Sequence, residues 1–272
     1  MRPESRLASI LTSLALVAAL AGCSRVTFLR PDASRGDFHR TAPEVQIRTD
    51  GGPRAAAFNL VQVARARLLS GDADAALETA QRAVRIDARH ADAHSLVGLS
   101  LDALGRGAQS GAHHRRAAEL APSEGALLNN YGIWLCGNGR AAESLAWFDR
   151  ALAAPGYATP DAALANAGTC ALRAGDAERA RASLRRAVEL KPDNALALRS
   201  LAEAELRLGR AFEARAFIER RLAAAPADEE SLLLASQIEH RLGDTAAAAR
   251  YVQRIRAEFP RTPDSAPEGG NR

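Results

Sequence analysis

Small and apolar residues recur among polar ones at spacings that predict paired helices. The pattern is clearest over residues 127–176. Gly132 lies seven residues before Gly139. Gly168 lies seven residues before Gly175 in the same way. Each predicted first helix therefore carries a small residue midway and ends at a glycine, which can adopt a positive φ and turn the chain. A second helix follows each turn directly.

Glycines of this kind recur along the chain at a nearly constant spacing. They are Gly71, Gly105, Gly139, Gly175, Gly209 and Gly243, separated by 34, 34, 36, 34 and 34 residues. This period is that of the tetratricopeptide repeat, a helix–turn–helix unit that buries its apolar face by stacking on its neighbours. We therefore predict an all-α, right-handed superhelical solenoid of about six tetratricopeptide repeats.

The repeats are counted from fourteen residues before each turn glycine. They begin at Ala57, Ala91, Gly125, Asp161, Ala195 and Glu229. Position eight is small in every repeat, and so is position twenty, which allows the two helices of a unit to approach closely. Prolines end four of the repeats, at Pro122, Pro192, Pro226 and Pro260. We place the array at 55–260, followed by a polar, disordered tail at 261–272.

The first 22 residues are typical of a secretory signal peptide. A basic start precedes an apolar run at 7–21, which is too short to span a bilayer. The run ends in Leu-Ala-Gly-Cys at Cys23, which resembles the bacterial lipobox, in which the cysteine is acylated and becomes the first residue of the mature chain. The alternative is an ordinary secretory signal with an incidental cysteine.

The residues after Cys23 indicate where and how the chain would be anchored. In lipoproteins of this type, the residue directly after the cysteine influences sorting. Here it is Ser24, which favours the outer membrane. Residues 23–54 are rich in proline and glycine and have no sustained helical period. We expect a flexible tether that holds the array at the periplasmic face of the outer membrane, anchored by acyl chains.

Composition and charge limit the classes of function. The chain is 47% hydrophobic but only 4% aromatic, which favours small-residue helix packing over a sheet core. Its net charge is +4, and its arginines are scattered over every repeat among aspartates and glutamates. Nucleic-acid binding would need a concentrated basic stripe, so we expect no nucleic-acid partner.

No set of residues in the sequence suggests catalysis. The sequence has no phosphate loop, no G-x-S-x-G and no H-E-x-x-H, and its only lysine is Lys191. His90 and His94 stand four apart, and His113 and His114 follow in the same repeat. A metal site is conceivable there, but His94 and His114 fall at packing positions and no nearby cysteine completes a ligand set. We expect no enzymatic activity, no cofactor and no metal.

In tetratricopeptide arrays, positions two, five, six, nine, twelve and thirteen of the first helix line a concave groove. The partner-binding candidates are Phe58, Val61, Leu68 and Leu69 in repeat one, Asn129, Asn130 and Asn166 in repeats three and four, and Arg199 and Arg207 in repeat five. Asn130 and Asn166 share position six, where stacked amides would bond the backbone of a bound peptide. The alternative is that Phe58 and Leu69 pack against the tether and the asparagines cap local structure.

Six short motifs resemble one family more specifically than the repeat does. They are LNNYG at 128–132, LCG at 135–137, AES at 142–144, FDRAL at 148–152, P-x-Y-x-T-P at 155–160 and N-A-G-x-C at 166–170. Together with the lipobox, they resemble the PilF/PilW family of type IV pilus biogenesis and stability lipoproteins. The resemblance implies a pilotin that brings the secretin subunit to the outer membrane and promotes its multimerisation. The alternative is a lipid-anchored scaffold for another envelope assembly or secretion complex.

With Cys23 lipidated, Cys136 and Cys170 remain in an oxidising compartment, where an even remainder is more often bridged than free. They occupy positions twelve and ten of adjacent first helices, whose axes lie about 8 to 10 Å apart. Both also fall inside the family motifs. We predict a disulfide between them; the alternative is two buried thiols that fill small gaps.

Overall fold

The helices begin and end close to where the glycine period places them. The structure, a computed structural model, describes residues 52–260, so the predicted signal peptide, the predicted lipidation site Cys23, most of the predicted tether and the predicted tail lie outside the described residues. Within 52–260 there are twelve α-helices and no strand.

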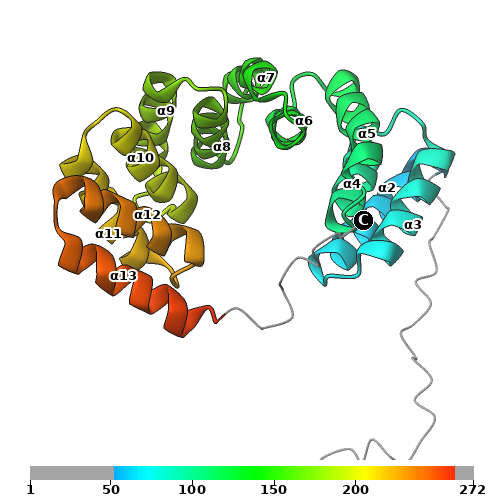
Figure 1. Ribbon diagram of the computed structural model, residues 1–272. Coiled ribbons are helices and arrows are strands. Elements are labelled where there is room, and N and C mark those ends of the chain that lie inside the picture. Colours follow the sequence, from blue (N-terminus) through cyan, green and yellow to red (C-terminus); the bar gives the residue numbers. More distant parts are fainter. Residues whose placement is uncertain (1–51, 261–272) are drawn as a thin grey trace, which may run out of the picture. The chain divides into compact units, whose positions relative to one another are not determined.

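The helices alternate between the first and second member of a repeat (Figure 1). The first helices are α2 (Gly52–Leu69), α4 (Ala91–Ala103), α6 (Gly125–Gly137), α8 (Pro160–Arg173), α10 (Ala195–Arg207) and α12 (Glu229–Leu242). The second helices are α3 (Ala73–Ile86), α5 (Gly107–Leu120), α7 (Ala141–Ala153), α9 (Ala177–Leu190), α11 (Ala211–Ala224) and α13 (Thr245–Glu258). Each helix packs against its neighbours in the chain, and each first helix also contacts the next first helix. The predicted all-α fold of six helix pairs is confirmed.

The turn between the two helices of each repeat depends on glycine. All six turn glycines have a positive φ, between 70° and 84°. In three repeats the next residue is an aspartate whose side chain accepts a hydrogen bond from a backbone N–H of the second helix, at Asp72, Asp176 and Asp244. Such a cap satisfies one of the free N–H groups at the helix start.

Close approach of the paired helices explains the small residue at position eight. An added Cβ on Gly132 would lie 2.8 Å from the ring of Phe148. One on Gly168 would lie 2.3 Å from Leu184 Cγ. Phe148 and Leu184 are fully buried and project from the facing second helix, so they occupy the space that the glycines leave.

The first helix is longer than the repeat pattern predicts. α2 begins at Gly52, five residues before the repeat start at Ala57. Residues 52–54, which the pattern assigns to the tether, therefore lie in its first turn. Pro53 is tolerated there because the first N–H groups of a helix need no partner within the helix.

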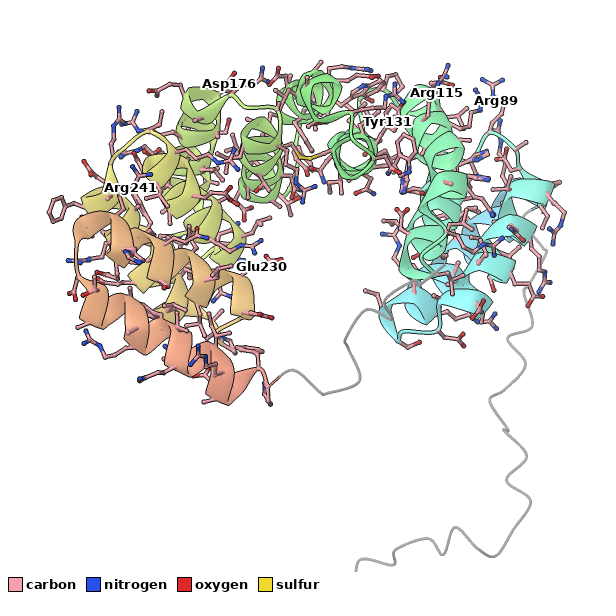
Figure 2. The ribbon with its side chains drawn as sticks, viewed as in Figure 1. Arg89, Arg115, Tyr131, Asp176, Glu230 and Arg241 are labelled. Atoms are coloured by element: carbon pink, nitrogen blue, oxygen red, sulfur yellow. A yellow bond between two sulfur atoms is a disulfide. The ribbon has the colours of Figure 1, made fainter. Side chains whose placement is uncertain are left out.

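The predicted disulfide is present and joins α6 to α8. The Cα atoms of Cys136 and Cys170 lie 5.8 Å apart, and both residues are buried. Figure 2 shows the bond between α6 and α8. It links repeats three and four, whose connecting segment is two residues longer than the others.

A buried carboxylate holds three arginines of the second half of the array. Glu205 on α10 is completely buried. Its Oε1 accepts hydrogen bonds from Arg181 Nε at 3.2 Å and Arg185 Nη2 at 2.7 Å. Its Oε2 accepts one from Arg210 Nη1 at 3.4 Å. Part of the arginine content is therefore structural rather than scattered over a solvated surface.

Two of the histidines form a pair between α4 and α5. His94 Nδ1 lies 3.2 Å from His113 Nδ1, and His94 Nε2 lies 3.1 Å from the carbonyl oxygen of Ala88. A carbonyl only accepts, so His94 carries its proton on Nε2 and its Nδ1 accepts from His113. Among the described residues no group of three or more His, Cys, Asp or Glu side chains is arranged to hold a metal ion.

Burial lowers the pKa of His94 and of His113 below the usual range for histidine. The charge of Arg116 lowers the pKa of His94 further, and electrostatic repulsion within the histidine cluster, first from His94, lowers that of His113. The unfolded chain takes up protons near pH 6.5, where the folded pair resists them, so the free energy of unfolding should fall as the pH drops below about 6.5.

Urea unfolding at pH 7 and pH 5 measures this loss. His113→Gln should reduce it, and His240→Gln, at an exposed position on α12, is the matched control that should not. An equal loss in wild type and His113→Gln would contradict the assignment.

Candidate interaction groove

The first helices form a continuous surface because each one contacts the next, from α2 through α4, α6, α8 and α10 to α12. Residues at equivalent positions of these helices therefore share one face of the described array. Every partner-binding candidate that the repeat positions predict lies on one of these first helices, but not all of them reach the surface.

At the amino-terminal end, the structure separates two exposed side chains from two packed ones. Phe58 is 55% exposed and Leu69 is 84% exposed. Val61 is buried in the core between α2, α3 and α4, and Leu68 packs against the same core. Val61 is therefore unavailable to a partner, because its side chain already fills the space between the first two repeats.

The asparagines connect neighbouring first helices. Asn166 Nδ2 on α8 donates to Asn129 Oδ1 on α6 at 3.2 Å. Asn130 Nδ2 on α6 donates to Ser95 Oγ on α4 at 3.3 Å. The expected stacking of Asn130 on Asn166 is thus replaced by two separate bonds. Asn129 is buried, whereas Asn130 and Asn166 are half-buried.

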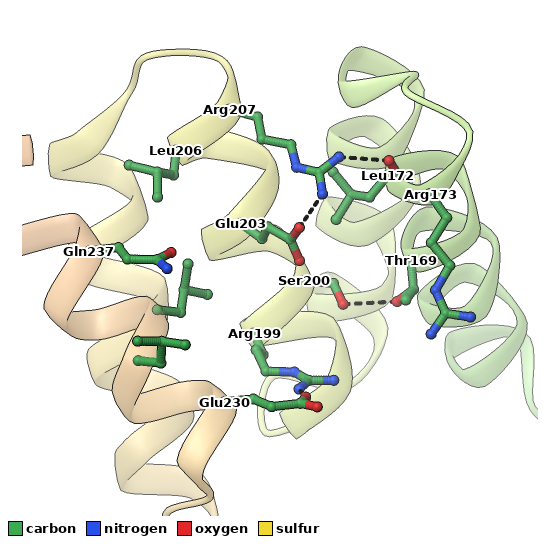
Figure 3. A pocket seen from close by; sticks show the side chains of 12 residues that line it. Thr169, Leu172, Arg173, Arg199, Ser200, Glu203, Leu206, Arg207, Glu230 and Gln237 are labelled. Carbon is green, nitrogen blue, oxygen red and sulfur yellow. Dashed lines mark hydrogen bonds and ion pairs between the residues drawn. The ribbon is translucent and has the colours of Figure 1, made fainter. Parts of the chain in front are cut away.

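The groove is hollowed in its second half. A pocket of about 540 Å³ lies between α8, α10 and α12 (Figure 3). It is lined by Thr169, Leu172, Arg173, Arg199, Ser200, Glu203, Leu206, Arg207, Glu230, Leu233, Leu234 and Gln237. Arg199 and Arg207, both on α10, were partner-binding candidates from the repeat positions. The lining residues that α8 and α12 contribute were not among the candidates. Their sequence signal is weak because leucine and arginine are common in every repeat.

Charges on the pocket wall are partly paired. Arg199 forms an ion pair with Glu230, and Arg207 forms one with Glu203. Arg207 Nη1 also donates to the carbonyl oxygen of Leu172, 2.7 Å away. Figure 3 shows how these contacts bridge the three helices.

A hydroxyl pair joins α8 to α10 inside the same pocket. Thr169 Oγ1 and Ser200 Oγ lie 2.8 Å apart, and Thr169 also donates to Ala165 O at 2.9 Å. Ser200 therefore donates to Thr169, because the single proton of Thr169 is already used. Hydroxyls, an amide, ion pairs and leucines along one wall suit recognition of a polypeptide.

Six stacked helix pairs, six turn glycines with positive φ and a groove along the first helices define the fold of a tetratricopeptide-repeat protein. The tetratricopeptide repeat family profile matches residues 171–238. No curated protein sequence matches the chain significantly.

Solved structures give a closer comparison. The chain is similar to PilW, a widely conserved type IV pilus biogenesis factor, with 28% identity over 76% of this chain and 95% of PilW, and a TM-score of 0.70. PilF of Pseudomonas aeruginosa shares the fold, with 20% identity over 78% of this chain and 96% of PilF, and a TM-score of 0.68. YrrB, a tetratricopeptide-repeat protein with an unusual peptide-binding site, also shares the fold, with 16% identity over 65% of this chain and 90% of YrrB, and a TM-score of 0.53.

Proposed function

We propose that this protein is a lipid-anchored scaffold of the outer membrane that binds the secretin subunit of a type IV pilus. In this role it promotes the localisation of the secretin to the outer membrane and its multimerisation there. The observation that carries the proposal is the similarity to the pilus biogenesis factor PilW, which extends over 76% of this chain and 95% of the PilW chain. The groove along the first helices supplies a surface for such a partner.

The membrane anchor in this proposal is the acylated Cys23, with Ser24 favouring the outer membrane. Both residues lie outside the described part of the chain. Among the described helices, none is long and apolar enough to cross a membrane. Several acyl chains would hold the protein at the membrane because each buried CH₂ contributes about 0.8 kcal/mol.

Deletion of the protein tests the function. We expect the secretin to lose its multimers, or to miss the outer membrane, when its size is read on a semi-denaturing gel and its location by cell fractionation. Wild-type protein should restore both.

The Cys23→Ser variant is a second arm of the same experiment. We expect it to restore neither property, because the array would no longer be held at the membrane. Processed Cys23→Ser protein in the outer membrane would contradict the anchor. Normal secretin multimers in the deletion strain would instead favour a scaffold for another envelope assembly or secretion complex.

A further inference from the structure

We propose that the pocket between α8, α10 and α12 is a subsite for a partner segment in which an acidic side chain neighbours a large aliphatic one. This inference rests on the proposed role as a protein-binding scaffold. It adds the chemistry of the segment that one part of the groove selects.

The anionic half of this specificity comes from Arg173, the last residue of α8. Arg173 is exposed on the pocket wall, and within the described part of the chain its guanidinium has one polar contact, from Nη1 to Cys136 Sγ at 3.8 Å. Sulfur is a weak acceptor and does not neutralise the charge. Among residues 52–260 no carboxylate lies within ion-pair distance of Arg173. Its donors are therefore available to a carboxylate from outside.

The other charges of the pocket cancel in pairs. Arg199 is matched by Glu230, and Arg207 by Glu203. Because these four groups sum to zero, the lining has a net charge of +1, which is that of Arg173. A single carboxylate complements this charge. A polyanion such as a nucleic acid would meet the two glutamates on the same wall, so the lining disfavours it.

Leucines supply the aliphatic half. Leu172 and Leu234 are buried and form part of the lining. Leu233 on α12 is 49% exposed and faces the pocket as one of the large apolar side chains that the described array leaves open. A volume of about 540 Å³ is within the range of small-molecule sites, roughly 300 to 1,000 Å³, and has room for two neighbouring side chains of a peptide.

Selection from a library of random peptides displayed on phage tests the proposal without knowledge of the natural partner. The full-length protein, purified in detergent, is used as the target in parallel with Arg173→Gln and Leu233→Ser. We expect wild type to enrich peptides with Asp or Glu within two positions of Leu, Ile, Val or Met. Both substitutions are at exposed positions, so the fold should persist, and a far-ultraviolet circular dichroism spectrum checks it.

Fluorescence anisotropy of one enriched, labelled peptide gives the magnitude. Arg173→Gln should weaken binding about tenfold, as expected for loss of a charge-assisted hydrogen bond. Arg173→Lys should retain part of the affinity. Arg186→Gln removes a charge from an exposed position on α9 and is the matched control that should bind like wild type. Replacing the acidic residue of the peptide with its amide should reproduce the loss.

Three results would overturn the proposal: no enrichment, enrichment of peptides without an acidic residue, or equal binding by wild type and Arg173→Gln. These results are distinct from failure of the proposed function, which deletion and the secretin gel decide. Lost secretin multimers together with no acidic preference would leave the scaffold role standing and remove the subsite.

Discussion

Reduction of the disulfide between Cys136 and Cys170 is expected to lower the free energy of unfolding by about 3 to 4 kcal/mol. The bridge closes a loop with a sequence separation of 34 and so restricts the unfolded chain. It also clamps α6 to α8 at the joint that carries the two extra residues. Urea unfolding with and without reductant measures the difference.

The double variant Cys136→Ser, Cys170→Ser is the control for this prediction. It should unfold like the reduced wild type and should not respond to reductant. A wild-type change below about 1 kcal/mol would show that the loop-closure account does not hold for these two repeats.

Replacing Phe148 with alanine should lower the free energy of unfolding by about 3 to 5 kcal/mol. Phe148 is completely buried on α7, with its ring against Gly132 of α6. Truncation leaves a cavity that neither helix can close, because both helices are also held by their neighbouring repeats.

Phe212→Ala is the matched control, since Phe212 on α11 is 74% exposed. It should change the free energy of unfolding by no more than about 0.5 kcal/mol. Urea unfolding of the two variants side by side measures both. Similar losses in both variants would contradict the packing of Phe148 against Gly132.

Much of the fold follows from the sequence because backbone requirements are local. A glycine with positive φ at a fixed period sets the helix boundaries, and α4, α6, α10 and α12 begin at the predicted repeat starts. The disulfide was also predictable, because the repeat register places Cys136 and Cys170 on adjacent first helices.

The side-chain arrangement of the groove was less predictable. Neighbouring positions on a helix point in directions about 100° apart, so small differences in helix rotation decide whether a groove residue faces outward or inward. The side chain of Val61 lies in the core, and Asn166 donates a hydrogen bond to Asn129 rather than lying over Asn130. The convergence of three arginines on Glu205 depends on side chains from α9, from α10 and from the turn before α11, which no local pattern encodes.

In the proposed function, the groove binds the secretin. The most direct measurement is titration of the purified secretin subunit with the full-length protein in detergent, comparing wild type with Phe58→Ser, Leu69→Ser. Both side chains are exposed at the amino-terminal end of the groove. We predict a saturable complex that the double variant weakens at least about tenfold, as expected when interface anchors are truncated. No complex, or equal affinity in the two proteins, would contradict it.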